Sequence, residues 1–131
     1  MQATATQQCN ILIADDEKAV STTVSFIVKR LGHAVEVVND GEPALDKIRQ
    51  QPDHYQLLIT DHAMLKMDGL KLMEHLKRPG FRGKILVLSG YLSPELEEAY
   101  RSMGADRIMH KPFDTDTLRK AVNELMDWVH C

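Results

Sequence analysis

The chain has 131 residues, of which 44% are hydrophobic, and a formal net charge of −3. This length suits one domain and leaves no room for a second, and the slight negative charge excludes the basic surface that direct nucleic-acid binding needs. No stretch approaches the ~20 apolar residues of a membrane span, so we expect no membrane association.

The first eight residues have no basic segment and no apolar run, so they are not a secretory signal. We expect a flexible tail at 1–8, followed by a single domain at 9–131. Cys9 and Cys131 lie near opposite ends, and neither has the spacing of a metal ligand. We therefore expect two free thiols in the reducing cytosol and a cytoplasmic protein.

Five short apolar runs alternate with five longer segments of helical period. This alternation predicts an α/β fold in which helices cover both faces of a parallel sheet. Strands are expected at about 10–14, 34–38, 55–60, 84–89 and 107–110.

The first predicted helix follows the first strand and is rich in β-branched residues, which favour strands. Its length and the helical spacing of Val20, Val24, Ile27 and Leu31 nevertheless predict a helix, which ends near Gly32.

The remaining helices carry clearer signals. We expect the second near 41–49 and the third near 69–77, and the fourth begins with the cap Ser93 followed by Pro94. The fourth has an apolar face formed by Leu96, Ala99, Tyr100 and Met103. Asp114 caps the last helix, whose apolar face is formed by Leu118, Ala121, Val122, Leu125 and Val129.

Polar side chains follow four of the predicted strands. Asp15 and Asp16 follow the first, Asp61 ends the third, Ser89 ends the fourth, and Lys111 follows the fifth. Because functional groups collect at the carboxyl ends of parallel strands, this pattern predicts a site for a divalent cation and a phosphoryl group. Magnesium is the expected cation, since it prefers hard oxygen ligands.

Each of these residues also has an ordinary structural explanation. An Asp-Asp pair after a strand is often a turn or a helix cap, Ser89-Gly90 can be a simple turn, and Lys111-Pro112 an exposed loop. Their joint occurrence at the correct strand ends, in this order, favours the functional interpretation.

The chain resembles the receiver domains of two-component response regulators over about residues 9–130. The resemblance rests on Asp15-Asp16, the segment Asp61-His62-Ala63-Met64-Leu65-Lys66-Met67-Asp68-Gly69, Ser89-Gly90, Gly104-Ala105-Asp106 and Lys111-Pro112-Phe113. It implies a flavodoxin-like (βα)5 fold with a parallel sheet of five strands in the order 2-1-3-4-5.

The resemblance also implies roles for individual residues. Asp61 is expected to be the phosphoacceptor, Ser89 the switch hydroxyl, and Lys111 the cation that contacts the phosphoryl oxygens. The expected magnesium ligands are Asp15, Asp16, Asp61 and the backbone carbonyl of Ala63. A cis peptide bond is expected between Lys111 and the proline that follows it.

These roles describe a signalling phosphoacceptor and not an enzyme, apart from self-catalysed phosphotransfer and autodephosphorylation. The phosphoryl group would come from a sensor histidine kinase or a histidine phosphotransfer protein, and the phosphorylated domain would bind a downstream protein target. The alternative is a receiver-like protein-binding module that acts without phosphorylation. A phosphatase with an aspartyl-phosphate intermediate is disfavoured, because such enzymes carry Asp-x-Asp after the first strand.

The sequence departs from the family at three positions. Ile108 stands where receivers commonly have a Tyr or Phe that moves inward on activation, which puts that aromatic switch in doubt. Leu65 replaces a common proline in the loop after Asp61, so we expect a less restricted loop. Tyr91 either covers the path of the hydrolytic water and prolongs the phosphorylated state, or faces solvent with no kinetic role.

In receivers, the fourth helix, fifth strand and fifth helix usually form the signalling face. By this resemblance, the candidate partner contacts are Tyr91, Leu92, Tyr100 and Arg107. The alternative is that they are scattered surface residues.

Overall fold

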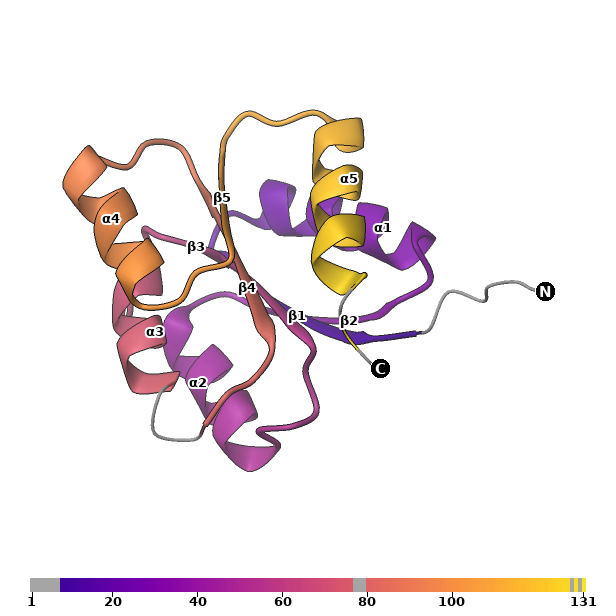
Figure 1. Cartoon of the computed structure of the whole chain (residues 1–131), viewed down its shortest axis with the longest axis horizontal. Coiled ribbons are helices and arrows are strands. Elements are labelled where there is room, and N and C mark those ends of the chain that lie inside the picture. Colours follow the sequence, from indigo (N-terminus) through magenta and orange to yellow (C-terminus); the bar gives the residue numbers. More distant parts are fainter. Residues whose placement is uncertain (1–7, 77–79, 128, 130) are drawn as a thin grey trace.

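A parallel sheet of five strands forms the centre of the molecule, in the order β2-β1-β3-β4-β5 (Figure 1). The computed structural model describes residues 8–76, 80–127, 129 and 131. The strands are β1 (Asn10–Ala14), β2 (Ala34–Val38), β3 (Leu57–Asp61), β4 (Lys84–Ser89) and β5 (Arg107–His110). The predicted flavodoxin-like α/β fold and its strand order are therefore confirmed.

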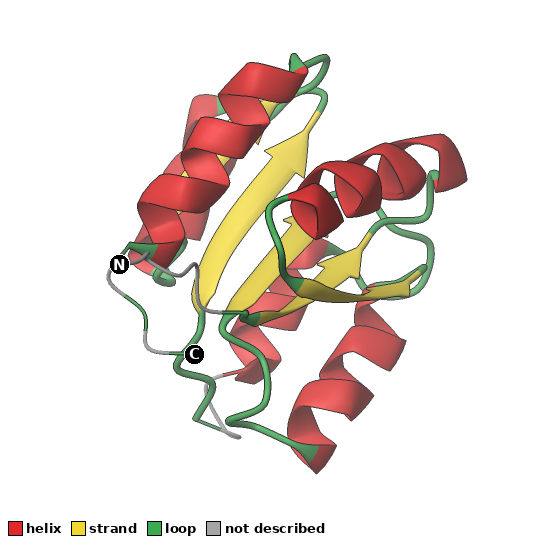
Figure 2. Ribbon diagram, turned by 90° about the vertical axis from the view of Figure 1, so that its right-hand side faces the viewer, coloured by secondary structure: helices red, strands yellow, loops and turns green. Residues whose placement is uncertain are grey.

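Helices cover both faces of this sheet (Figure 2). They are α1 (Lys18–Arg30), α2 (Gly41–Gln50), α3 (Gly69–Leu76), α4 (Pro94–Ser102) and α5 (Thr115–Met126). Side chains from α1 and α5 share one buried cluster with the sheet, and side chains from α2, α3 and α4 share the other. Because both faces are covered, β1, β3 and β4 are almost entirely apolar, as the sequence suggested.

Two boundaries differ from the sequence prediction. The third strand runs over Leu57–Asp61 and not 55–60. Tyr55 lies before the strand, and its hydroxyl donates to Glu36. The last helix ends at Met126, so Val129 lies outside it and still packs against the core. The predicted tail residues 1–7, and residue 77 of the predicted third helix, lie outside the described residues.

The β-branched helix α1 forms as predicted. Ser21, Val24, Ile27 and Val28 are its buried residues, and they lie at helical spacing. Burial of this apolar stripe outweighs the weak local preference of the segment for helix, because helical stability in proteins comes mostly from tertiary packing.

The two cysteines are paired, which corrects the expectation of free thiols. Cys9 at the start of the sheet and Cys131 after α5 form a disulfide with their Cα atoms 4.8 Å apart. Their 122-residue separation in sequence concealed this proximity, which arises because α5 packs across the sheet and brings the end of the chain back to the start of β1.

Strand register brings the polar strand ends to one edge of the sheet. Ala14 pairs with Thr60, so Asp15 and Asp61 are next to each other in neighbouring strands. Asp61 pairs with Leu88, which places Ser89 one residue further along β4. None of the helices among the described residues is long and apolar enough to span a bilayer.

Candidate functional site

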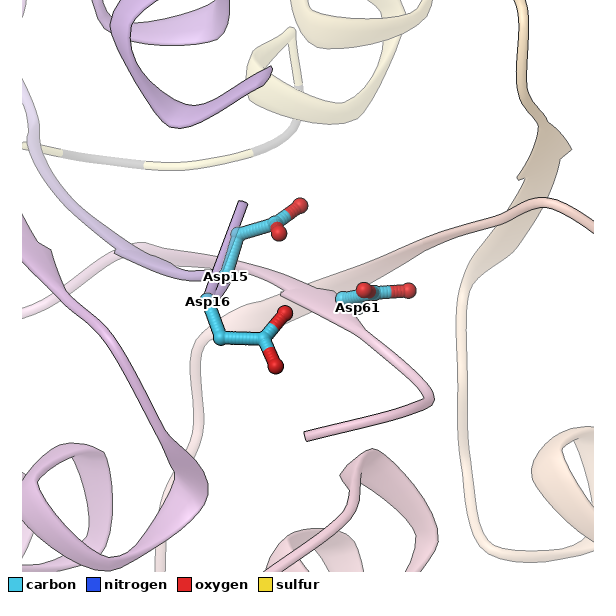
Figure 3. A group of neighbouring side chains, drawn as sticks. All are labelled: Asp15, Asp16 and Asp61. Atoms are coloured by element: carbon cyan, nitrogen blue, oxygen red, sulfur yellow. The ribbon is translucent and has the colours of Figure 1, made fainter. Parts of the chain in front are cut away.

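Three carboxylates meet at the carboxyl edge of the sheet (Figure 3). Asp15 and Asp16 leave β1, Asp61 ends β3, and one carboxylate oxygen from each lies within 4.8 Å of the others. Asp15 is 4% exposed and Asp61 is 5% exposed, whereas Asp16 faces solvent. The three aspartates predicted to form a cation site therefore lie together.

The ammonium group of Lys111 lies beside this acidic group. Its Nζ is 3.2 Å from Asp15 Oδ2, 3.3 Å from Asp61 Oδ2 and 3.1 Å from Glu17 Oε1. The Lys111–Pro112 peptide bond is cis, as expected, and the Lys111 amide donates to the Ser89 carbonyl at 2.8 Å. The backbone of β4 thus fixes the position from which the lysine side chain reaches the carboxylates.

Burial and charge act in opposite directions on these groups. Burial raises the pKa of Asp61, while the nearby Lys111 charge lowers it and the Asp15 charge raises it again, with a net upward shift. Burial lowers the pKa of Lys111, but the hydrogen bond to Glu17 and the charges of Asp61 and Asp15 outweigh burial and raise it. The lysine therefore stays protonated and offers a fixed positive charge.

Ser89 lies at the same edge and is 4% exposed. Its hydroxyl is 3.5 Å from the carbonyl oxygen of Tyr91, at the limit of a hydrogen bond. Ala63 lies two residues beyond Asp61, in the loop between β3 and α3, and is exposed. Strand register places Ser89 at the edge that carries Asp61, and Ala63 follows Asp61 by two positions; their functional roles stay predictions.

Asp40 is a further residue of this site that the sequence analysis missed. Its side chain caps α2 by accepting from the Glu42 amide, and it also accepts from the Lys66 and Met67 amides at 2.8 and 2.9 Å. These contacts hold the loop after Asp61 against the start of α2. Asp40 therefore anchors the loop that contains Leu65, together with the hydrogen bond from the Gly41 amide to the Met67 carbonyl.

Glu17 is the second missed residue. It is the N-cap of α1, and its amide donates to Asp15 Oδ1 at 2.9 Å while its carboxylate binds Lys111. Its place directly after Asp15-Asp16 was visible in the sequence, but the contact with Lys111 spans 94 positions and depends on the fold.

Two of the four predicted partner contacts are wrong. Tyr100 is 0% exposed and Leu92 is 2% exposed, because both side chains pack into the apolar cluster between the sheet and α2, α3 and α4. Tyr91 is 77% exposed, and Arg107 forms an ion pair with Glu124 of α5 at 2.7 Å. Only Tyr91 and Arg107 are placed where a partner can reach them.

A groove of about 830 Å³ opens beside the acidic group. Asp15 and Asp16 are among its lining residues, and the exposed side chain of Phe26 on α1 and that of Val37 on β2 contribute apolar surface. Two of the three carboxylates therefore border a partly apolar groove.

Comparison with known proteins agrees with this geometry. The family model "Response regulator receiver domain" matches residues 11–123. The chain is 35% identical over 127 residues to the gliding motility regulatory protein of Myxococcus xanthus, covering 95% of this chain and 16% of that protein. It is 33% identical over 117 residues to the response regulator MprA of Mycobacterium leprae, covering 88% of this chain and 50% of that protein. The chain thus spans half or less of the length of these relatives.

Solved structures give the same result. The chemotaxis protein CheY4 of Vibrio cholerae superposes with a TM-score of 0.81 and 26% identity, covering 91% of this chain and 99% of that one. A CheY-like receiver domain protein of Methanospirillum hungatei superposes with a TM-score of 0.86 and 26% identity, covering 92% and 95%. Strand order, acidic edge and sequence matches agree, and the chain belongs to the family of response regulator receiver domains.

Proposed function

We propose that Asp61 accepts a phosphoryl group from a phosphohistidine of a partner protein in a magnesium-dependent reaction, and that phosphorylation changes which protein the domain binds. Members of this family serve as phosphoacceptors in two-component signalling. The observation that carries the assignment to Asp61 is its carboxylate, which lies 3.3 Å from the Lys111 ammonium and shares the acidic edge with Asp15 and Asp16.

The only covalent bond that the protein forms in this reaction is the one from Asp61 to phosphorus. An oxygen of the Asp61 carboxylate forms a bond to phosphorus while the bond between phosphorus and the histidine nitrogen breaks, and the imidazole leaves. The transferred group carries negative charge on its oxygens, so catalysis depends on positioning and on neutralising that charge. At ~4 Å and an effective dielectric constant of ~20, the Lys111 charge contributes roughly 4 kcal/mol before desolvation.

The donor set of the acidic edge fits Mg²⁺. Its three side chains offer hard carboxylate oxygens, and no basic group among the described residues pairs with Asp16. We assign Asp15, Asp16 and Asp61 as the side chains that would hold the ion, with the Ala63 carbonyl as a further ligand. When bound, magnesium supplies positive charge that offsets the negative charge of the carboxylates and of the phosphoryl oxygens.

The partners follow from this role. We propose a sensor histidine kinase or a histidine phosphotransfer protein as the donor and a protein target as the recipient of the signal. The groove lined in part by Asp15 and Asp16 is a surface to which the donor protein can bind while its histidine reaches Asp61. The cytoplasmic location and the division into a tail at 1–8 and a domain at 9–131 stay predictions.

Phosphate incorporation from acetyl phosphate tests the assignment. With magnesium present, we expect the wild-type chain to gain one phosphoryl group by intact mass, and Asp61→Asn to gain none. The control is Asp46→Asn, which changes an exposed aspartate of α2 and should be labelled normally. Labelling of Asp61→Asn at the wild-type level would reject Asp61 as the acceptor. Absence of labelling in the wild-type chain would favour a binding module that acts without phosphorylation.

A further inference from the structure

Helix α4 buries one side chain completely. Tyr100 is the only residue of α4 that is buried, and it is 0% exposed, while the rest of the helix is partly or fully open to solvent. In Figure 1 the helix lies at the far left, beside α3. Partly buried Leu96 and a contact between Glu97 and His110 of β5 also hold the helix, but Tyr100 reaches furthest into the molecule, so its contacts bear directly on the position of α4.

The Tyr100 hydroxyl contacts the residue next to Asp61. It lies 2.5 Å from Nδ1 of His62, and the two rings pack edge to face with centroids 5.6 Å apart. The His62 amide in turn donates to Asp61 Oδ1 at 2.7 Å. A continuous series of contacts thus joins the Asp61 carboxylate to α4 through two residues.

The backbone is closely packed around Gly69, at the start of α3. A Cβ atom on Gly69 would lie 2.5 Å from the Asp61 carbonyl oxygen and 2.6 Å from the Tyr100 hydroxyl oxygen, so only glycine fits at the start of α3. The Gly69 amide also donates to the His62 carbonyl at 2.9 Å. This close packing around Gly69 favours a coupled movement of Asp61 and Tyr100.

The Tyr100 hydroxyl is also within the electric field of Asp61. Burial raises the pKa of Tyr100, and the negative charges of Asp68 and Asp61 raise it further. Phosphorylation would replace one negative charge at Asp61 with about two and would remove one carboxylate oxygen from its present role. Both changes act on the His62 amide and on the Tyr100 hydroxyl, which contacts the His62 ring.

Position 108 of the fifth strand offers no aromatic ring that could take this part, and His110 at the end of that strand is directed to Glu97 of α4 and not to Asp61. Ile108 on β5 is aliphatic and packs against the same apolar cluster as Tyr100. Tyr91, the other tyrosine near the site, is 77% exposed. Among the described residues near Asp61, Tyr100 is therefore the buried aromatic side chain with a polar group directed toward the acceptor.

We propose that Tyr100 is a positioning residue that, through His62, couples the state of Asp61 to the position of α4. The proposal rests on the proposed function, because it takes phosphorylation of Asp61 as the event that is transmitted. It assigns to a tyrosine of α4 and a histidine beside the acceptor the coupling that Ile108 cannot provide. Phosphorylation alters the hydrogen bond to the His62 amide, the His62 ring follows, and Tyr100 moves α4.

Hydrogen exchange of α4 with and without beryllofluoride, a mimic of the acyl phosphate, tests the proposal. Binding of beryllofluoride with magnesium is followed separately by ¹⁹F NMR, and deuterium uptake is measured over Pro94–Ser102. We expect the ligand to change α4 uptake in the wild-type chain. Tyr100→Phe removes only the hydroxyl and should still bind the ligand, but should lose most of that change. The matched control Tyr55→Phe, at a buried tyrosine whose hydroxyl donates to Glu36 at the other end of β3, should keep it.

A second pair of variants changes the other partner and does not depend on the stability of Tyr100→Phe. His62→Leu removes the ring nitrogen and should lose the α4 response, whereas His62→Asn retains a hydrogen-bonding atom near the Nδ1 position and should restore much of it. A purely structural role would lower stability in both variants without separating their responses to the ligand.

The outcomes distinguish the coupling through Tyr100 from the proposed phosphoacceptor function. A normal α4 response in Tyr100→Phe or in His62→Leu would overturn the coupling. Ligand binding to the wild-type chain with no change in α4 would also overturn it, while leaving Asp61 as the acceptor. Failure of the wild-type chain to bind beryllofluoride would instead reject the proposed function, and the coupling with it.

Discussion

At the scale of single residues, Asp61 is held in a state that costs folding stability. Burial and the Asp15 charge raise its pKa more than the Lys111 charge lowers it. A carboxyl group whose pKa is raised on folding binds protons more readily in the folded state, so its stability cost appears as the pH rises through the raised pKa. The nucleophile is thus kept reactive at the expense of the fold.

Replacing Asp61 with asparagine should therefore stabilise the protein. At pH 7 and without divalent cations, we expect Asp61→Asn to raise the free energy of unfolding, because asparagine has no charge to bury. The gain should shrink as the pH falls below the ordinary aspartate pKa of about 3.9, where the wild-type carboxyl becomes protonated in both the folded and the unfolded state. Urea denaturation across this pH range measures it, and a destabilised variant at pH 7 would contradict the explanation.

Lys111 has the opposite role, since it neutralises buried charge. We expect Lys111→Ala to lower the free energy of unfolding by about 3 kcal/mol, because Asp15 and Asp61 would remain buried without their cation. Labelling by acetyl phosphate should slow at least about tenfold, or ~1.4 kcal/mol of barrier.

Magnesium should restore part of the stability that Lys111→Ala loses, because it brings positive charge to the same carboxylates. Thermal unfolding with magnesium and with a chelator measures this. Lys29→Ala, at an exposed position of α1, is the control and should respond as the wild-type chain does. A magnesium-dependent rise in Tm no larger in Lys111→Ala than in the wild-type chain would contradict the shared role.

At the scale of elements, α2 supports the loop that carries the site. Asp40 both caps α2 and binds the Lys66 and Met67 amides, so one side chain connects a helix start with the loop after Asp61. A cap alone contributes about 1 kcal/mol, and the two loop hydrogen bonds add to that figure.

Asp40→Ala should therefore cost about 2–3 kcal/mol of stability and also weaken magnesium binding, because the loop with Ala63 loses its anchor. Asp114→Ala is the matched control, since Asp114 caps α5 through the Thr117 amide and, within the described part of the chain, makes no hydrogen bond or ion pair with the acceptor loop. The control should cost about 1 kcal/mol and leave magnesium binding unchanged. Equal magnesium affinities in the two variants would show that Asp40 acts as a cap only.

The elements also show what sequence patterns can and cannot reveal. Alternating apolar runs predicted the sheet, its order followed from the resemblance, and the strand ends placed Asp15, Asp16, Asp61 and Lys111 together. For Tyr100 two sequence signals disagreed: its helical spacing predicted an apolar, core-facing position, whereas the resemblance placed it among the partner contacts. The side chain is fully buried, as its spacing predicted.

Contacts between distant parts of the chain account for the other omissions. Glu17 and Asp40 each look like ordinary helix caps in sequence, and their second role depends on a lysine or a loop brought near by the fold. The cysteine pair likewise depends on where α5 ends. Such contacts leave no periodic signal, so hydrophobic patterning cannot reveal them.

At the scale of the whole molecule, the disulfide connects the first strand with the end of the chain. Closing so long a loop restricts the unfolded state, and such a bond commonly contributes ~2–4 kcal/mol. We expect a reducing agent, or the pair Cys9→Ser and Cys131→Ser, to lower the free energy of unfolding by about that amount.

Phosphorylation should not depend on this bond, because it lies at the opposite end of the strands from Asp61. Labelling of the reduced and oxidised protein by acetyl phosphate at a temperature well below Tm measures this independence. A labelling rate that falls on reduction would indicate that the bond also shapes the site.

The closeness of Cys9 and Cys131 permits a circular permutation of the chain. Because their Cα atoms are 4.8 Å apart, a very short peptide could join the two positions and close the chain into a ring. New ends opened in the connection 51–54, between α2 and β3, would produce a circular permutant whose first strand is β3. Asp61 would then come near the start of the polypeptide, with the loops at the carboxyl edge of the sheet left intact.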